Sequence, residues 1–279
     1  TKKLLNMGFD ILDIDKYKGK TNEYVDYLKR LKFTNGWPIE NIYDFLDDDL
    51  HFGMTMLAFG DGDSLVAGAS NTTSSVIRSA IRLVGVKPDS NWLSSVFFMI
   101  PPSHDNTTAI LSYADCSVIP DPSIEQLVSI AYNASKFHKL IIGKEPKVAF
   151  LSFSTNGSAS HYKVEKIKNS VKMFEQKYPQ ILCEGEVQFD AAINTDIAIR
   201  KNSSSKLRGS ANVLIFPDLD SGNIAYKITE RLANYAAWGP LLQGLKKPVH
   251  DLSRGCSVDD IISVSAIAAL QAKDCYANV

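Results

Sequence analysis

The chain has 279 residues, of which 45% are hydrophobic and 22% are charged, and its formal net charge at pH 7 is -1. A chain of this length and composition can bury a sizeable core in one large domain or two moderate ones, which excludes a disordered protein. A net charge so close to zero supplies no overall field that would attract nucleic acid or an anionic membrane. We therefore expect neither as a partner.

The cysteines and histidines show no metal-binding pattern. No cysteine lies within four residues of another, and no two histidines have a His-x-x-x-His spacing. We therefore expect reduced thiols in a cytoplasmic protein, and no metal site. No apolar run reaches the roughly 18 residues of a membrane-spanning helix. Because the chain starts without Met and within a helical pattern, we expect its N-terminus to be incomplete.

Short apolar runs alternate with longer amphipathic segments along the chain. Continuous apolar runs are typical of strands buried on both faces, whereas apolar residues at three- and four-residue steps are typical of helices. This alternation predicts an α/β architecture, and the short interval between the second and third strands predicts an antiparallel pair within a mixed sheet. The predicted strands are 65–69, 95–100, 109–113, 147–153 and 212–216, and the predicted helices are 22–32, 39–45, 74–83, 124–140, 163–177, 224–235 and 258–272.

Two segments before the middle of the chain carry candidate binding residues. Residues 60–78 are rich in glycine and hydroxyl side chains and run into a predicted helix that carries Arg78. This pattern is compatible with an anion-binding site, or with a surface salt bridge of Arg78. The glycine spacing fits neither a Walker A loop nor a dinucleotide fingerprint. Residues 29–32, Lys-Arg-Leu-Lys, form either a solvated helix face or a binding site for the phosphates of a nucleotide-like cofactor.

Residues 213–223 are a third candidate segment, a buried strand that ends in a polar turn. Ligands gather at the carboxyl ends of strands in open α/β sheets, so this turn is a candidate site. A helix cap at Asp220 or Asn223 explains the same residues equally well.

Residues 248–260, PVHDLSRGCSVDD, form the strongest candidate site. Ser257 and Asp260 have the spacing of a capping box, with Asp in place of the usual Glu or Gln, so a helix cap explains these two residues. A cap does not explain Ser253 and Arg254, which come just before it. An arginine and a hydroxyl ahead of a helix N-terminus suit an anion, because the guanidinium fork and the free backbone N–H groups bind phosphate or carboxylate oxygens.

Eight phrases, in this order, resemble the phosphate acetyltransferase (phosphotransacetylase) family. They extend over nearly the whole chain, and their collinearity makes the resemblance stronger than any single phrase. The phrases are residues 95–99, 121–122, 151–155, 188–192, 216–219, 222–223, 239–244 and 248–260.

The resemblance implies a two-domain α/β/α fold with a mixed sheet, like that of isocitrate and isopropylmalate dehydrogenases. The first domain would be discontinuous, 1–88 plus 244–279, and would lack the N-terminal strand–helix unit of the family. The second domain, 89–243, would be inserted between these pieces and carry the contacts of a homodimer. The active site of the family lies in the cleft between the two domains.

The resemblance also implies a reaction. Acetyl phosphate and coenzyme A would give acetyl-CoA and inorganic phosphate, reversibly, by direct attack of the thiolate within a ternary complex. Coenzyme A is then a substrate, and no cofactor is permanently bound. A free thiol is mostly protonated at neutral pH, so a positioned base would help, with a gain of about 10²–10⁴-fold.

The family's site residues map onto this chain one by one. Asp260 matches the general base, although its place at a helix N-terminus favours the charged, weakly basic carboxylate. Ser253 and Arg254 match the residues that contact the oxyanion and the phosphoryl oxygens, and Arg78 and Thr73 match those that bind acetyl phosphate.

The coenzyme A contacts map onto Lys29 and Arg30, where the family has Arg before Lys, so the order of the two basic residues is reversed. The family also has His at the place of Asn71, Pro at Ser79 and Asn at His250. The reversed order of Lys29 and Arg30 affects the coenzyme A contact more than the chemistry, because Lys lacks the bidentate fork of Arg. The alternatives are transfer of propionyl or butyryl groups, and a non-catalytic domain that senses acetyl-CoA, as in malic enzymes.

Overall fold

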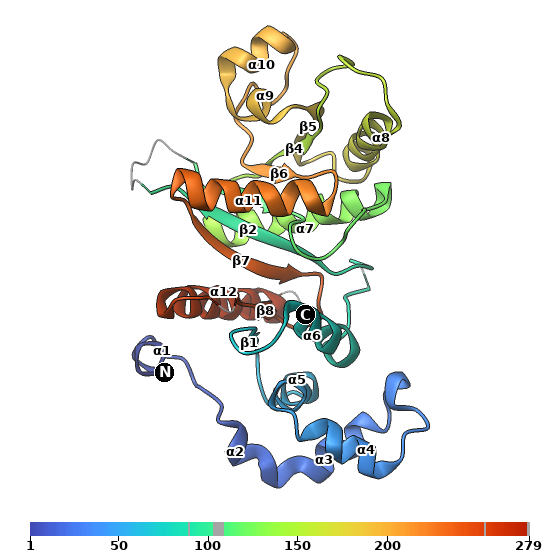
Figure 1. Ribbon diagram of the computed structural model, residues 1–279, viewed down its shortest axis with the longest axis vertical. Helices are drawn as coiled ribbons and strands as arrows, with labels where there is room; N and C mark the ends of the chain where they lie inside the picture. Colours follow the sequence, from blue (N-terminus) through green and yellow to red (C-terminus); the bar gives the residue numbers. More distant parts are fainter. Residues whose placement is uncertain (89, 103–108, 254, 278–279) are drawn as a thin grey trace. The chain divides into compact units, whose positions relative to one another are not determined.

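The computed structural model describes residues 1–277 except Asp89, residues 103–108 and Arg254. It forms two compact units: unit 1, Thr1–Lys87 with Leu245–Val279, and unit 2, Pro88–Gly244 (Figure 1). Strands and helices alternate through most of the chain, and the larger sheet holds both parallel and antiparallel pairs, so the predicted α/β class and mixed sheet are confirmed.

Unit 1 is mostly helical and contains one pair of parallel strands, β1 and β8. Both α5 and α12 pack against β1, and Figure 1 shows α12 above this strand and α5 below it. The elements are α1 (Lys2–Asn6), α2 (Ile14–Tyr17), η1 (Lys18–Lys20), α3 (Thr21–Leu28), η2 (Lys32–Thr34), α4 (Ile39–Leu46), α5 (Asp49–Phe59), β1 (Leu65–Ala67), α6 (Thr73–Ser79), η3 (Ala80–Val84), β8 (Val249–Asp251) and α12 (Val258–Ala277).

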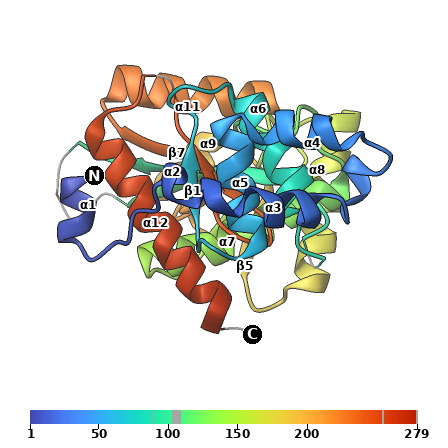
Figure 2. The ribbon, with the colours of Figure 1, turned by 90° about the horizontal axis from the view of Figure 1, so that it is seen from below.

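The N-terminal and C-terminal segments of unit 1 also contact each other through α1 and α12. Figure 2 shows α1 beside the N-terminal end of α12, where Lys3 Nζ lies 3.3 Å from Asp259 Oδ1. Both side chains of this ion pair are largely exposed, so it contributes little to stability.

Unit 2 is built on a six-stranded sheet with the order β5-β4-β6-β3-β2-β7. The first four strands in this order are parallel, while β2 runs antiparallel to both β3 and β7, which confirms the predicted antiparallel pair. The elements are β2 (Ser94–Ile100), β3 (Leu111–Ala114), α7 (Ile124–Ile142), β4 (Lys147–Leu151), α8 (Tyr162–Lys177), β5 (Leu182–Val187), α9 (Phe189–Ile193), α10 (Thr195–Lys201), β6 (Val213–Ile215), α11 (Leu219–Ala233) and β7 (Ala236–Gln243).

Helices cover both faces of this sheet. Phe97 and Phe98 are neighbours in β2, so their side chains point to opposite faces. Phe97 stacks on Tyr226 of α11 with ring centroids 4.1 Å apart, and Phe98 contacts Phe137 of α7 at 5.7 Å. Therefore α11 and α7 lie on opposite faces, which explains why the strands are continuously apolar in sequence.

Several elements of the structure are not predicted by the sequence pattern, among them α2, α5, α9, α10, β5, β7 and β8. α5 is buried over most of its surface and therefore has no polar face to reveal a helical period. β8 has three residues, β5 is interrupted by glutamates, and β7 contains Pro240, which is tolerated because β7 lies at the edge of the sheet. α11 begins at Leu219, earlier than expected, and its cap is Asp218 rather than Asp220 or Asn223.

Candidate functional site

The carboxyl ends of β1 and β8 lie side by side in unit 1. Ala67 pairs with Asp251, and the backbone N–H of Leu252 donates to the carbonyl oxygen of Ala67 at 2.8 Å. The segment after β1 continues into α6 with Thr73 and Arg78, and the segment after β8 passes Ser253 and continues into α12. The structure thus brings these two candidate segments to one edge of the strand pair, where ligands gather in α/β folds.

Gly68 allows the two segments to approach each other closely. Its φ is +103°, and a Cβ built at this position would lie 2.2 Å from Asp251 Oδ1 and 2.3 Å from the carbonyl oxygen of Leu252. Any side chain here would collide with the end of β8 and would also be strained by the backbone angle. The end of β8 therefore packs directly on a backbone turn.

Asp251 is fully buried at the end of β8. Burial raises the pKa of its carboxyl group, and the nearby Thr73 hydroxyl and the backbone N–H of Leu252 offset this effect only in part. Among the described residues, neither carboxyl oxygen makes a hydrogen bond of standard geometry. This residue belongs to the PVHDLSRG phrase, but nothing in its spacing singles it out.

The predicted capping box at the start of α12 is confirmed. The backbone N–H and the hydroxyl of Ser257 each donate to Asp260 Oδ2 at 2.8 Å, and the backbone N–H of Asp260 donates to Ser257 Oγ at 3.1 Å. The Asp260 side chain is half-buried, whereas Ser253 is exposed. Arg254 lies outside the described residues.

α6 begins with a cap of its own. Thr72 Oγ1 accepts a hydrogen bond from the backbone N–H of Ser75 at 3.2 Å, so Thr72 is the cap and Thr73 is the first helical residue. Arg78 is exposed, and within the described residues it makes no ion pair. The salt-bridge alternative for Arg78 therefore has no support in this part of the chain.

Lys29 and Arg30 lie elsewhere in unit 1, at the C-terminal end of α3. Both are exposed, and Lys29 Nζ lies 3.1 Å from Asp26 Oδ1 on the same helix. α3 packs on α4 and α5.

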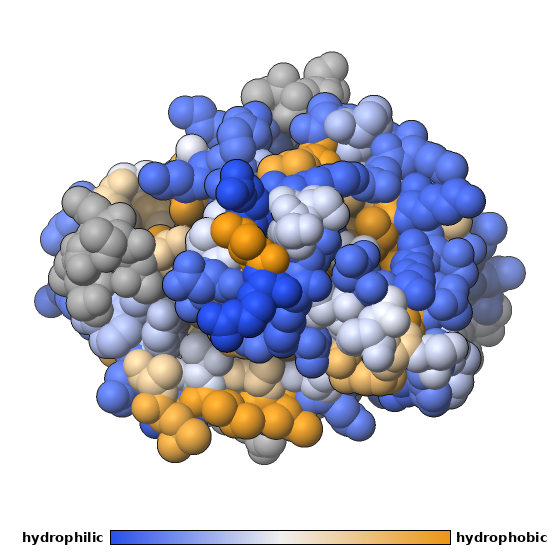
Figure 3. Space-filling view, turned by 90° about the horizontal axis from the view of Figure 1, so that it is seen from above, coloured by the Kyte–Doolittle hydropathy of each residue, from blue (hydrophilic) through white to orange (hydrophobic). Residues whose placement is uncertain are grey.

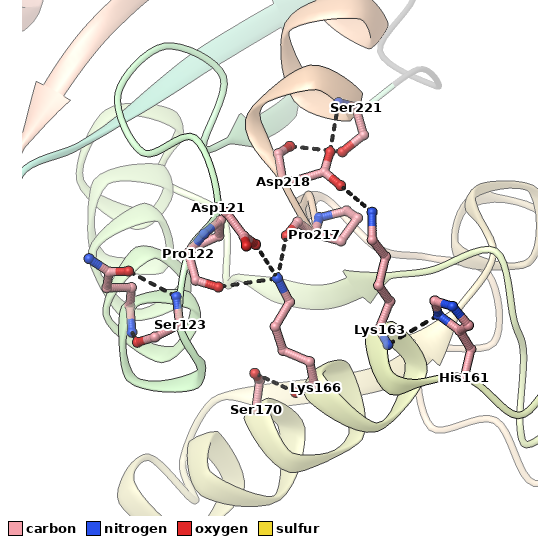
Figure 4. A network of polar contacts seen from close by, with 11 residues as sticks. Asp121, Pro122, Ser123, His161, Lys163, Lys166, Ser170, Pro217, Asp218 and Ser221 are labelled. Carbon is pink, nitrogen blue, oxygen red and sulfur yellow. Dashed lines mark hydrogen bonds and ion pairs between the residues drawn. The ribbon is translucent and has the colours of Figure 1, made fainter.

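Unit 2 carries a polar network around Lys166 that the sequence pattern does not reveal (Figure 4). Lys166 Nζ donates to Asp121 Oδ1 at 2.8 Å and to the carbonyl oxygens of Pro122 and Pro217 at 3.2 Å each. One ammonium group from α8 thus holds the two segments that follow β3 and β6. In sequence Lys166 is only a helical lysine, whereas its partners fall in the phrases 121–122 and 216–219.

The same network includes the cap of α11. Asp218 accepts from the backbone N–H of Ser221 at 3.0 Å, and Lys163 Nζ lies 3.4 Å from its Oδ2 (Figure 4). Burial alone would raise the pKa of Asp218, but the hydrogen bonds from Ser221 and the Lys163 ammonium hold it below its usual range. Lys163 and Lys166 of α8 therefore both bind the segment that joins β6 to α11.

Glu186, in β5, is a buried carboxylate of unit 2. It accepts hydrogen bonds from Ser154 Oγ at 2.9 Å and from the backbone N–H of Gly157 at 2.7 Å. Glu186 also lines a cavity of ≈ 240 Å³ together with Lys168 and Asn202. Its bonds hold the turn after β4, so we assign it to the fold.

The described residues contain neither a candidate metal site nor a candidate membrane-spanning helix. No group of three or more His, Cys, Asp or Glu side chains in these residues could hold a metal ion. None of the described helices is both long and apolar enough to span a bilayer.

The chain is similar to characterised proteins over almost its full length. Residues 1–269 match the family model described as Phosphate acetyl/butaryl transferase. A phosphate acetyltransferase of Acetivibrio thermocellus is 42% identical over 258 residues, which cover 91% of this chain and 77% of that protein. A phosphate acetyltransferase of Thermoanaerobacterium thermosaccharolyticum is 40% identical over 262 residues, which cover 93% of this chain and 80% of that protein. The solved structure of EutD phosphotransacetylase from Staphylococcus aureus superposes with a TM-score of 0.83 at 37% identity, covering 97% of this chain and 82% of that one.

Proposed function

This chain belongs to the phosphate acetyl/butaryl transferase family, and we propose that it transfers an acetyl group reversibly between acetyl phosphate and coenzyme A. The thiolate of coenzyme A attacks the carbonyl carbon of acetyl phosphate, the C–S bond forms, and the C–O bond to phosphate breaks. Acetyl-CoA and inorganic phosphate leave. The observation that carries this proposal is the meeting of the segments of Thr73 and Ser253 at the ends of β1 and β8.

We assign the role of base to Asp260. It would take the thiol proton of coenzyme A, directly or through one water. Its carboxylate is already ordered by the cap, because Oδ2 accepts from both the N–H and the hydroxyl of Ser257. These two hydrogen bonds hold the carboxylate in one place at the N-terminal end of α12.

We assign the binding of acetyl phosphate to Ser253, Arg254, Arg78 and Thr73. Ser253 and Arg254 would stabilise the oxyanion of the tetrahedral intermediate and the phosphoryl oxygens. Arg78 would neutralise the phosphoryl charge, and its exposure without an ion pair among the described residues supports that use. Coenzyme A would be held through its phosphates by Lys29 and Arg30, both of which are exposed.

The substrate assignment is tested by measuring acetyl-CoA formation from acetyl phosphate and coenzyme A. The same assay is repeated with propionyl phosphate and butyryl phosphate. We expect the highest kcat/KM with acetyl phosphate. A preference for butyryl phosphate would support the longer-chain alternative, and binding of acetyl-CoA without any turnover would support the sensing-domain alternative.

We also propose that the protein is a homodimer joined through residues 89–243 and is located in the cytoplasm. The dimer is supported by three apolar side chains at successive four-residue steps of α11, Ile224, Ile228 and Leu232, which are 57%, 52% and 80% exposed. Figure 3 shows a row of hydrophobic side chains along this edge of unit 2. A helix with one apolar face toward its own sheet and a second toward solvent is typical of an interface.

A further inference from the structure

Four aromatic rings of unit 1 gather where the chain passes from α3 to α4, and we call Phe33, Trp37, Phe45 and His51 the ring cluster. Trp37 contacts Phe33 and Phe45 edge to face, with ring centroids 5.8 Å apart in both pairs. Phe33 also contacts Phe45 at 5.8 Å, and His51 stacks on Phe45 at 3.9 Å. Because these residues come from η2, α4 and α5, the rings are held from several sides.

Trp37 is the member of the ring cluster that is most open to solvent. Its side chain is 36% exposed, whereas the other three rings are half-buried. Its two ring contacts are nearly perpendicular, with interplanar angles of 87° and 79°, and none of the described rings lies parallel to it. The indole therefore has room for a flat ring to stack on it.

The turn that carries Trp37 is folded back onto the end of α3. The Thr34 hydroxyl proton is shared between the carbonyl oxygens of Leu28 and Leu31, the second at 3.0 Å. The backbone N–H of Trp37 then donates to the carbonyl oxygen of Thr34, also at 3.0 Å. These bonds place Trp37 on the same turn as the basic residues 29–32.

Two of these basic residues have no acidic partner in the described part of the chain. Lys29 pairs with Asp26 at 3.1 Å, but Arg30 and Lys32, which are both exposed, make no ion pair there. Free cations beside an open aromatic ring suit a nucleotide, because the cations bind its phosphates and the ring stacks on its base.

We propose that the ring cluster binds the adenine ring of coenzyme A, which stacks on Trp37, while Arg30 and Lys32 bind the phosphates at the same end of the molecule. The proposal rests on the proposed function and extends it to the part of the substrate that takes no part in the chemistry. An uncharged base with anionic phosphates matches an uncharged ring with two cations. The rings are already ordered by their mutual contacts, so binding immobilises few side chains.

The test compares coenzyme A with pantetheine, which carries the thiol but lacks the nucleotide. Trp37→Leu keeps an apolar side chain and removes the aromatic face, so kcat/KM with coenzyme A should fall about 5–50-fold, the usual effect of losing one stacked base. With pantetheine, kcat/KM should equal that of wild type, which also shows that the variant is folded. Trp37→Phe keeps an aromatic face and should stay within about threefold of wild type with both substrates.

Lys32→Gln tests the phosphate contact, and Tyr43→Leu is the matched control. Lys32→Gln should lower kcat/KM with coenzyme A about 3–10-fold, make it less sensitive to salt, and leave that with pantetheine unchanged. Tyr43 is an exposed aromatic residue of α4 outside the ring cluster. Its hydroxyl donates to Asn22 Oδ1 at 2.7 Å, at the other end of α3, so Tyr43→Leu should match wild type with both substrates.

A binding measurement with adenosine 3′,5′-bisphosphate, the nucleotide end of coenzyme A, needs no turnover. Adenine stacked on an indole quenches its fluorescence, and the chain has three tryptophans. We expect this probe to quench the fluorescence of wild type. In Trp37→Phe the quenching should disappear, while titration calorimetry still detects binding. If Trp37→Leu does not fold, this comparison of wild type with Trp37→Phe decides the proposal.

The outcomes separate this proposal from the proposed function. A wild type that binds the bisphosphate with quenching but makes no acetyl-CoA would contradict the proposed function and support the nucleotide site. A wild-type kcat/KM with coenzyme A in Trp37→Leu, an equal fall with pantetheine, or the same quenching in Trp37→Phe would overturn the site. A halved molecular mass of Trp37→Leu in light scattering would also overturn it, because a second copy of the chain would then cover Trp37.

Discussion

The backbone N–H of Ser257 donates to Asp260 Oδ2 at 2.8 Å, and the backbone N–H of Asp260 donates back to Ser257 Oγ at 3.1 Å. This reciprocal pair begins α12 and at the same time fixes the carboxylate that we assign as the base. A helix cap and a catalytic position are therefore not alternatives here, because the cap orders the side chain for its proposed use.

Asp260→Asn removes the proton acceptor and keeps the shape of the cap. We expect kcat for acetyl-CoA formation to fall by about 10²–10⁴-fold, the usual contribution of a positioned base. The neighbouring Asp259→Asn is the control, since Asp259 is exposed and pairs only with Lys3 among the described residues. Its kcat should match wild type. An unchanged kcat in Asp260→Asn would show that another group takes the proton.

Ser257→Ala removes the hydroxyl that faces Asp260 Oδ2 and the N–H of Asp260. The free energy of unfolding measured with urea should fall by about 0.5–2 kcal/mol, the range for loss of a helix cap. The variant keeps the bond from the Ser257 N–H to Asp260, so kcat should fall less than in Asp260→Asn. A stability equal to that of wild type would mean that this cap contributes nothing.

Lys166→Met removes the ammonium that holds Asp121, Pro122 and Pro217 together (Figure 4). Two carbonyl groups lose a charged donor, so the free energy of unfolding should fall by about 1–3 kcal/mol. Lys172→Met, an exposed position on the same helix, is the control and should change it little. Equal effects of the two substitutions would contradict a bridging role for Lys166.

Protonation of His138 should couple stability to pH. Burial lowers its pKa to about 4 in the folded protein, whereas an unfolded histidine has a pKa near 6.5. Between these values the unfolded chain binds a proton that the folded protein does not, so stability is complete above pH 6.5 and is lost as the pH falls toward 4, by roughly 3 kcal/mol. His138→Gln should flatten this slope in urea unfolding from pH 7 to pH 4. If the free energy of unfolding of His138→Gln depended on pH as steeply as that of wild type, His138 would not be a source of the pH dependence.

Ile228→Lys places a charge in the middle of the exposed apolar row of α11. If the row is a dimer interface, light scattering should give the monomer mass for this variant and twice that mass for wild type. Lys227→Glu, on the polar side of the same helix, is the control and should keep the wild-type mass. A monomeric wild type would contradict the proposed homodimer.

Structural features that depend on a local sequence pattern could be predicted well. Contacts between segments that are distant in the sequence could not be predicted. The Ser257–Asp260 cap depends on a three-residue spacing, so it could be read directly, as could the buried runs of β2, β4 and β6. The approach of Gly68 to Asp251 depends on the pairing of β1 with β8, which comes from opposite ends of the chain. No local pattern encodes that pairing.

The same distinction explains the two residues that only the structure brought out. In the sequence, Asp251 looks like a loop residue and Lys166 like an ordinary helix residue. What distinguishes them is their surroundings: full burial against a glycine turn for Asp251, and two proline carbonyl groups for Lys166. The chemistry of the candidate site came from the family resemblance, because spacing alone indicated only an anion site and a helix cap.

The measurement that bears most directly on the account is the initial rate of acetyl-CoA formation from acetyl phosphate and coenzyme A at neutral pH, with wild type and Asp260→Asn side by side. We expect turnover by wild type and a rate lower by about 10²–10⁴-fold in the variant. This expectation would be contradicted by a wild-type protein that folds and binds coenzyme A yet forms no acetyl-CoA.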